Sequence, residues 1–213
     1  MTILKAVTIT LSGITYKEDM EQVLHLFITN KCRHNCPLCC NKFYEIDKIP
    51  VVTVELLKSV QTVCLTGGEP LGINTSMLGK FINNLRKQYL NVENLYIYTS
   101  GREAGRHLFS LLCETENIEG PRMIDGINFA PKDFDDTLGI YKCLVDNTKS
   151  FYTYFKEAHL SNRLYVFPDM EETVRKMIDS VPFETNLNII GRTWDNKFNT
   201  PKNEHFVRLP ILF

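Results

Sequence analysis

The chain has 213 residues, of which 24 are basic and 25 acidic, for a formal net charge of −1. Because these charges nearly balance, the composition argues against a protein built mainly to hold a nucleic-acid backbone, which usually carries a basic excess. The 44% share of hydrophobic residues indicates one globular domain over residues 1–213, and no apolar stretch approaches the ~20 residues that span a bilayer.

Short apolar runs alternate along the chain with amphipathic segments. Residues 1–13 read as a strand and lack the apolar region and cleavage site of a signal peptide, so we expect a cytoplasmic location. Further strands are predicted at residues 23–28, 62–65, 95–98, 126–129, 164–167 and 187–190. Helices are predicted at residues 76–90, 103–113 and 171–180, and a short one is predicted after a cap at Thr53.

Strands that alternate with helices pair in parallel through crossover connections. About six such units fit this length, fewer than a closed eight-fold barrel of about 250 residues needs. We therefore expect an α/β fold, an open partial (βα)6-type barrel with a mainly parallel sheet.

Three segments are harder to interpret. Residues 135–161 give no clear pattern; the aromatic run at 151–155 within them is read as core packing, with a platform for stacking bases as the alternative. An irregular C-terminal extension is expected from about residue 192. The apolar end at 206–213 is expected to dock on the domain.

Four of the seven cysteines fall within nine residues. Cys32, Cys36 and Cys39 form a CxxxCxxC, and three thiolates this close in a loop can wrap a soft metal centre. A [4Fe–4S] cluster held by three cysteines instead of the usual four leaves one iron open. Cys40 is read as a buried or secondary thiol, because adjacent side chains in a loop point apart. A structural zinc site that adds Cys40 or His34 is the alternative, although no second ligand pair follows.

With a second motif, this spacing resembles the signature of the radical S-adenosylmethionine (radical SAM) superfamily. Gly67, Gly68, Glu69 and Pro70 follow the strand predicted at 62–65 and match a segment that, in that family, binds the amino group of the methionine part of S-adenosylmethionine. Two glycines let backbone carbonyls approach a ligand, and a carboxylate suits an ammonium. The resemblance covers roughly residues 27–101.

Two weaker matches extend the resemblance. Thr99 and Ser100 follow the strand at 95–98, where many members have a Thr-Asn-Gly or Thr-Gly turn. Leu38 precedes the third cysteine, a position that is often aromatic and touches adenine, and an aliphatic side chain can also cover a base. Because the carboxyl ends of parallel strands share one edge, we expect all these segments to converge on one pocket.

Other positions are assigned less closely. Asn128, Lys132 and Arg192 lie near predicted strand ends and could touch the carboxylate or ribose of the ligand, although a surface or loop position is the simpler reading. The remaining cysteines are isolated, so a single cluster without an auxiliary-cluster domain is expected; they are Cys64, Cys113 and Cys143.

The resemblance implies an enzyme that cleaves S-adenosylmethionine reductively at a [4Fe–4S] cluster, with electrons from a donor such as flavodoxin or ferredoxin. The resulting 5′-deoxyadenosyl radical abstracts hydrogen from a substrate, for which we favour a small molecule or nucleotide. One alternative is an activating enzyme that installs a glycyl radical on a partner protein such as anaerobic ribonucleotide reductase. Another is a non-catalytic zinc or iron–sulfur module, which would leave the glycine-rich motif unexplained.

Overall fold

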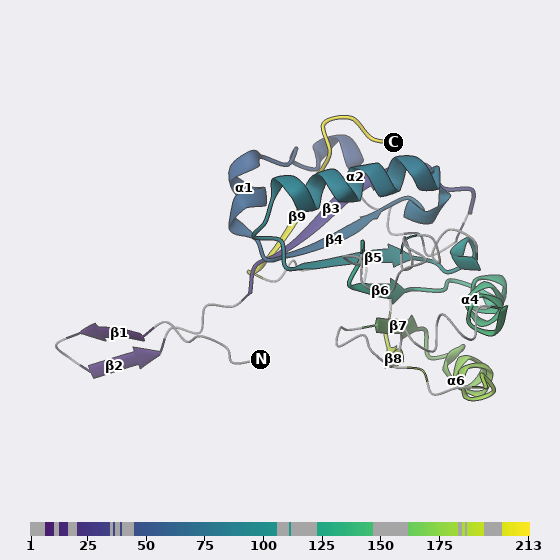
Figure 1. Ribbon diagram of the computed structural model, residues 1–213. Coiled ribbons are helices and arrows are strands. Elements are labelled where there is room, and N and C mark those ends of the chain that lie inside the picture. Colours follow the sequence, from purple (N-terminus) through teal and green to yellow (C-terminus); the bar gives the residue numbers. More distant parts are fainter. Residues whose placement is uncertain are drawn as a thin grey trace.

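The computed structural model describes residues 7–10, 13–16, 21–34, 36, 39, 45–105, 111, 123–146, 162–182, 185, 187–193 and 202–213. Its centre is a seven-stranded sheet in which every neighbouring pair is parallel (Figure 1). The strands are β3 (Val23–Thr29), β4 (Thr62–Gly67), β5 (Asn94–Thr99), β6 (Gly126–Phe129), β7 (Asn162–Val166), β8 (Leu187–Gly191) and β9 (Glu204–Arg208). Two further strands, β1 (Val7–Thr10) and β2 (Gly13–Tyr16), form a separate antiparallel pair; the single strand predicted at residues 1–13 covers β1 and only the first residue of β2.

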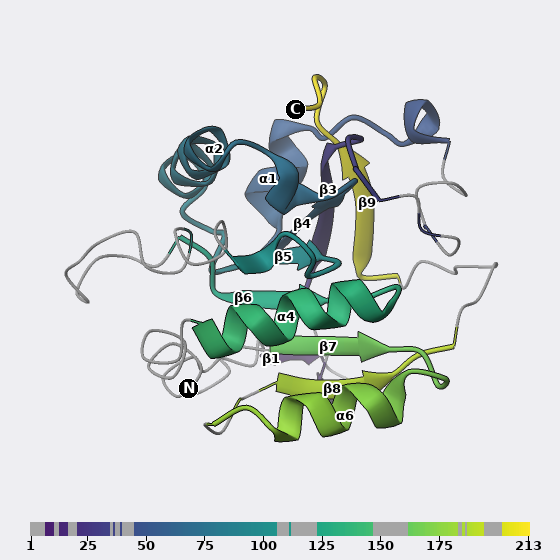
Figure 2. The same ribbon diagram turned by 90° about the vertical axis from the view of Figure 1, so that its right-hand side faces the viewer.

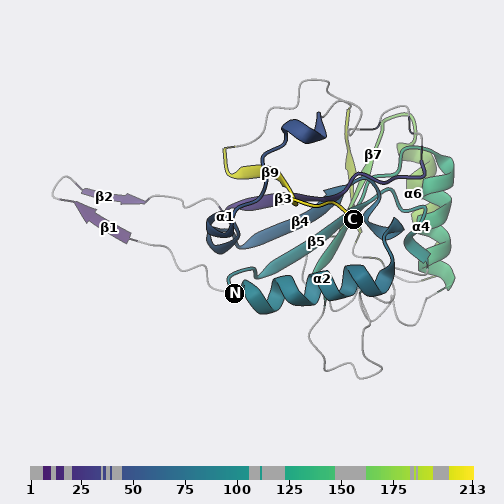
Figure 3. The ribbon, with the colours of Figure 1, turned by 90° about the horizontal axis from the view of Figure 1, so that it is seen from above.

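The strand order is β8-β7-β6-β5-β4-β3-β9, so β3 to β8 follow one another across the sheet. A doubly wound sheet reverses direction at a switch point, whereas this sheet always advances the same way. Right-handed crossovers then place all the connecting helices on one face. Figures 2 and 3 show the helices beside a curved sheet; they are α1 (Val54–Ser59), α2 (Thr75–Gln88), α4 (Phe134–Asp146) and α6 (Glu171–Asp179).

This architecture is the expected one: an α/β fold with an open, all-parallel sheet flanked by helices. The six strands predicted from the sequence correspond to β3 to β8. Successive side chains along each strand point to opposite faces of the sheet, and those that point toward the helices are apolar. The core that they build with the helices includes Leu26, Leu65, Ile97, Ile127 and Leu164.

The helix predictions hold where the structure describes them. Thr53 caps α1, its hydroxyl oxygen accepting from the backbone nitrogen of Leu56 at 3.2 Å. The predictions at 76–90 and 171–180 correspond to α2 and α6. Of 103–113, Ala104, Gly105 and Leu111 are helical and the residues after Gly105 otherwise lie outside the described part. Helix α4 was not predicted, because all of it after Phe134 falls in the segment 135–161, for which the sequence gave no clear pattern. The aromatic run 151–155 also lies outside the described residues.

The C-terminal segment docks as expected, but as a strand that the sequence analysis did not predict. β9 pairs with β3 in parallel, with His25 opposite Phe206, and so adds a seventh strand at the edge. After β9, the backbone nitrogens of Leu209 and Phe213 donate to the carbonyls of Phe27 and Ile28 at 3.0 and 2.9 Å. Within the described residues, no helix has the length and apolar character needed to cross a bilayer.

Candidate functional site

The segments that follow β3 and β4 are joined by backbone hydrogen bonds at the carboxyl edge of the sheet. The nitrogen of Gly68 donates to the carbonyl of Thr29 at 2.6 Å, and that of Glu69 donates to the carbonyl of Lys31 at 2.9 Å. Thr29 ends β3, and Lys31 directly precedes Cys32. The glycine-rich turn therefore holds the beginning of the cysteine loop in place.

The two glycines are required by this close approach. Gly67 has a φ of +125°, which L side chains rarely adopt, and an added Cβ would lie 2.2 Å from the carbonyl oxygen of Thr29. A Cβ on Gly68 would lie 2.1 Å from the carbonyl oxygen of Lys31. Both obstacles are backbone atoms, so no change of rotamer could relieve the clash.

Glu69 connects the turn after β4 to the turn after β5. Its side chain is 3% exposed and accepts hydrogen bonds from the Thr99 hydroxyl at 2.8 Å, the Ser100 nitrogen at 2.9 Å and the Leu71 nitrogen at 3.1 Å. Burial raises the pKa of Glu69, and these hydrogen bonds oppose that rise. Pro70 begins the 3-10 turn η3 (Pro70–Gly72) and is buried.

The turn after β5 is held from the other side as well. The Arg102 Nε donates to the buried carboxylate of Asp136 at 2.8 Å, and its Nη2 pairs with Asp133. Asp136 also accepts from the backbone nitrogen of Lys132 at 2.9 Å. Through these contacts, the turn at Ser100 is attached to the start of α4.

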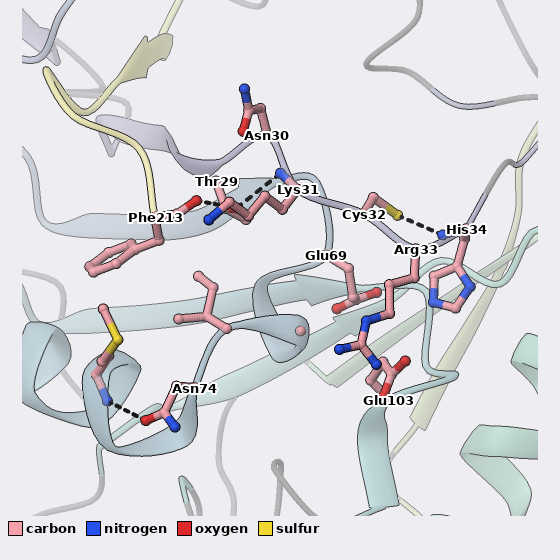
Figure 4. Close-up of a pocket in the computed structure, with 13 residues that line it drawn as sticks. Thr29, Asn30, Lys31, Cys32, Arg33, His34, Glu69, Asn74, Glu103 and Phe213 are labelled. Atoms are coloured by element: carbon pink, nitrogen blue, oxygen red, sulfur yellow. Dashed lines mark hydrogen bonds between the residues drawn. The ribbon is translucent and has the colours of Figure 1, made fainter.

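A cavity of about 530 Å³ opens at this edge of the sheet, within the range that binds small molecules (Figure 4). Cys32 and Glu69 both line it. Phe213 lies on its other side, where its carbonyl accepts from the Thr29 hydroxyl at 3.0 Å and its ring contacts Phe81 edge-on. The complete lining is Thr29, Asn30, Lys31, Cys32, Arg33, His34, Glu69, Gly72, Ile73, Asn74, Met77, Glu103 and Phe213.

The three predicted cluster ligands occupy different environments. Cys32 is exposed and its sulfur accepts from the His34 nitrogen at 3.4 Å, Cys36 is buried, and Cys39 is half-buried. Burial, together with smaller effects of the charges of Asp136, Cys32 and Cys39, raises the pKa of Cys36 to about 11. The thiols are therefore near enough to influence one another.

These thiols are nevertheless not gathered around a common point. Among the residues that the structure describes, no group of three or more histidine, cysteine, aspartate or glutamate side chains is arranged to hold a metal ion. The donors fit a soft metal centre by their chemistry, since three thiols follow one strand in one loop beside the cavity. Leu38, which was predicted to contact adenine, lies outside the described residues. Cys40, which was predicted not to be a metal ligand, lies outside them as well.

The remaining predicted contacts are not at the cavity. Asn128 is 1% exposed within β6, which corrects the reading of it as a surface or loop residue. Arg192 is exposed just after β8, and Lys132 is half-buried with its ammonium 5.2 Å from the centre of the Phe167 ring. None of the three lines the cavity.

The sequence analysis overlooked Phe213, Asn74 and Glu103 as lining residues. Phe213 reaches the cavity by docking on the end of β3, about 180 residues earlier in the chain. Asn74 carries an ordinary helix cap, in which its side chain accepts from the backbone nitrogen of Met77, and such a cap does not mark a binding site. No family model matches the chain. A search among curated proteins likewise finds no match.

Proposed function

We propose that the chain is a radical SAM enzyme. One observation carries this proposal: the Gly67-Gly68-Glu69-Pro70 turn is hydrogen-bonded on one side to the start of the cysteine loop and on the other to Thr99 and Ser100. Three segments that resemble the family separately are thereby joined beside one cavity. A non-catalytic metal module would need the cysteines but not this arrangement.

Cys32, Cys36 and Cys39 would hold the [4Fe–4S] cluster, with Cys32 nearest the cavity. When bound, the cluster and S-adenosylmethionine supply reductive cleavage and a 5′-deoxyadenosyl radical. The protein itself contributes position and the exclusion of water. The turn at Gly68 positions the cysteine loop, because the backbone hydrogen bonds from Gly68 and Glu69 set where this loop leaves β3.

Glu69 is suited to orient the ammonium group of S-adenosylmethionine. A carboxylate forms charge-assisted hydrogen bonds with an ammonium group, and Glu69 lines the cavity together with Cys32. Phe213 adds an apolar side chain to the opposite wall of the cavity. A small molecule or nucleotide is the proposed substrate, and a flavodoxin or ferredoxin the proposed electron donor.

The test is electron paramagnetic resonance of anaerobically reconstituted, reduced protein with and without S-adenosylmethionine. We expect a reduced [4Fe–4S] signal that changes when S-adenosylmethionine is added, because the ligand then binds the open iron. Bound zinc without a cluster signal would refute the proposal. A cluster signal that ignores S-adenosylmethionine would also refute it, since the open iron would be absent.

A further inference from the structure

The sheet face that points away from α1, α2, α4 and α6, here called the inner face, is polar and aromatic. On β5 the apolar Leu95 and Ile97 are buried in the core, whereas the alternate residues Tyr96 and Tyr98 are half-buried. Register continues the inner face across the sheet, since Tyr98 lies opposite Asn128 and Asn128 opposite Arg163. A face that served only to pack a core would not carry these side chains.

Two guanidinium groups meet at one tyrosine on this face. Arg163 Nη1 donates to the Tyr165 hydroxyl at 3.3 Å, and the Arg192 guanidinium lies 5.5 Å from the centre of the Tyr165 ring. Arg192 is held there by its backbone nitrogen, which donates to the carbonyl of Val166 at 2.7 Å. Burial lowers the pKa of His25, and the positive charge of Arg192 lowers it further. The charge of Arg192 is therefore felt across the inner face as far as β3.

Neither arginine has an acidic partner in the described part of the chain. The ion pairs found there join other residues. Glu204, the acidic residue of β9, is paired with His25 at 3.0 Å. Two like charges around one ring repel each other, and a half-buried guanidinium without a counter-ion is costly, so an anion between them would be stabilised.

Asn128 adds an independent sign of a ligand. Its side chain is 1% exposed, and its Oδ1 is a buried oxygen without a hydrogen-bond partner. Leaving such an acceptor unsatisfied destabilises the folded protein, and a buried unsatisfied group calls for a missing partner. Since Asn128 lies opposite Arg163 in the ladder, a bound donor group would lie beside Arg163.

We propose that the inner face at Asn128, Arg163, Tyr165 and Arg192 binds a small aromatic or heterocyclic substrate through an anionic carboxylate or phosphate group and an N–H or O–H donor. The arginines take the anion, Tyr165 contacts the ring, and Asn128 accepts from the donor. This inference rests on the proposed function, because it assigns the substrate of that enzyme to the sheet face next to the cavity at its carboxyl edge.

The test is calorimetric titration of the full chain with small probes at low ionic strength. The probes are 4-aminobenzoate, 4-aminophenyl phosphate, the neutral 4-aminobenzamide, and benzoate, which lacks the donor. We expect at least one anionic amino probe to bind about ten-fold more tightly than 4-aminobenzamide, as a charge-assisted hydrogen bond allows. The tighter of the carboxylate and phosphate probes identifies the anionic group.

Variants assign the contacts. Arg163→Gln should remove most of the preference for the anionic probes over 4-aminobenzamide. Arg192→Gln should do the same, and because Arg192 is exposed this variant is less disruptive to the fold. Asn128→Leu should remove the advantage of 4-aminobenzoate over benzoate. Arg175→Gln is the matched control, because Arg175 pairs with Glu171 along α6 and should leave binding unchanged.

The result is independent of the cluster test. No binding, equal binding of neutral and anionic probes, or unchanged binding in both inner-face arginine variants would overturn the inference. If that happens while the paramagnetic signal responds to S-adenosylmethionine, the proposed function stands and only the substrate assignment falls. If the probes bind as expected but no cluster forms, the anion site stands and the radical SAM proposal falls.

Discussion

Glu69 combines deep burial with an ionisable carboxyl group, and its hydrogen bonds explain how this burial is tolerated. Backbone and hydroxyl donors from two separate turns converge on its two oxygens. A carboxylate is suited to this task because it only accepts hydrogen bonds. Burial disfavours its charged form, as the direction of its pKa shift indicates. The residue thus links the turns after β4 and β5 as well as lining the cavity.

Replacing Glu69 with glutamine should weaken both the fold and the site. Both oxygens of Glu69 accept hydrogen bonds, so the amide nitrogen of glutamine would face a donor and leave it without an acceptor. We therefore expect the free energy of unfolding to fall by about 1–3 kcal/mol. Urea unfolding measures this loss, and equilibrium dialysis with S-adenosylmethionine measures the accompanying loss of affinity. Glu172→Gln is the control, since the contact that the described residues give Glu172 is an exposed pair with Lys176. Equal stability of Glu69→Gln and the wild type would contradict the assigned role.

At the level of elements, the site depends on how closely the ends of β3 and β4 approach. Their parallel ladder shifts register between Phe27 and Thr29, at the point where β4 ends in Gly67. The chain of β4 then passes within hydrogen-bonding distance of the loop after β3. Only residues without a Cβ allow this approach.

Gly68→Ala should therefore destabilise the protein by about 1–3 kcal/mol, the usual cost of overpacking. It should also reduce iron incorporation, because the carbonyl of Lys31 that the new methyl group displaces is next to Cys32. Chemical denaturation and iron analysis after reconstitution provide the two readouts. Gly105→Ala is the matched control, since within the described part of the chain a Cβ at that helical position meets no atom within 4 Å outside its own helix backbone and chain neighbours. A Gly68→Ala variant as stable as Gly105→Ala would refute the packing argument.

For the whole molecule, the topology separates the cysteine loop from the other described thiols. Cys64 lies within β4 and Cys143 within α4, and both are buried. Burial raises the pKa of each to about 12, so both remain neutral thiols near neutral pH. Buried, neutral thiols in separate elements do not form a second cluster site.

Reconstituted protein should accordingly hold about four irons per chain, the content of one [4Fe–4S] cluster. Replacing Cys32, Cys36 and Cys39 together with alanine should reduce the content to below about one iron, since Cys40 would be the one thiol left in this cysteine run and a single thiolate does not hold a cluster. Cys143→Ala should leave iron unchanged and serves as the control. Iron and acid-labile sulfide assays measure both values. Eight irons per chain, or iron retained by the triple variant, would contradict a single cluster in this loop.

The sequence was sufficient for the features that depend on local spacing. Alternation of short apolar runs with amphipathic segments gave six strands of the sheet, the α/β class and the open barrel, because burial on one face imposes a period of 2 or 3.6. The positions of Gly67 to Pro70 and of Thr99 after successive strands indicated that they would lie at one edge. That prediction follows from parallel pairing alone.

Contacts between distant segments were decided by the tertiary structure. β9 was missed because its polar residues Glu204, His205 and Arg208 mask the strand pattern, and it is stabilised by pairing with β3, about 180 residues earlier. The burial of Asn128, the meeting of Arg163 and Arg192 at Tyr165, and the place of Phe213 at the cavity depend likewise on register across strands. Local periodicity determines which face a side chain takes, whereas the folded sheet alone determines which side chain lies beside it.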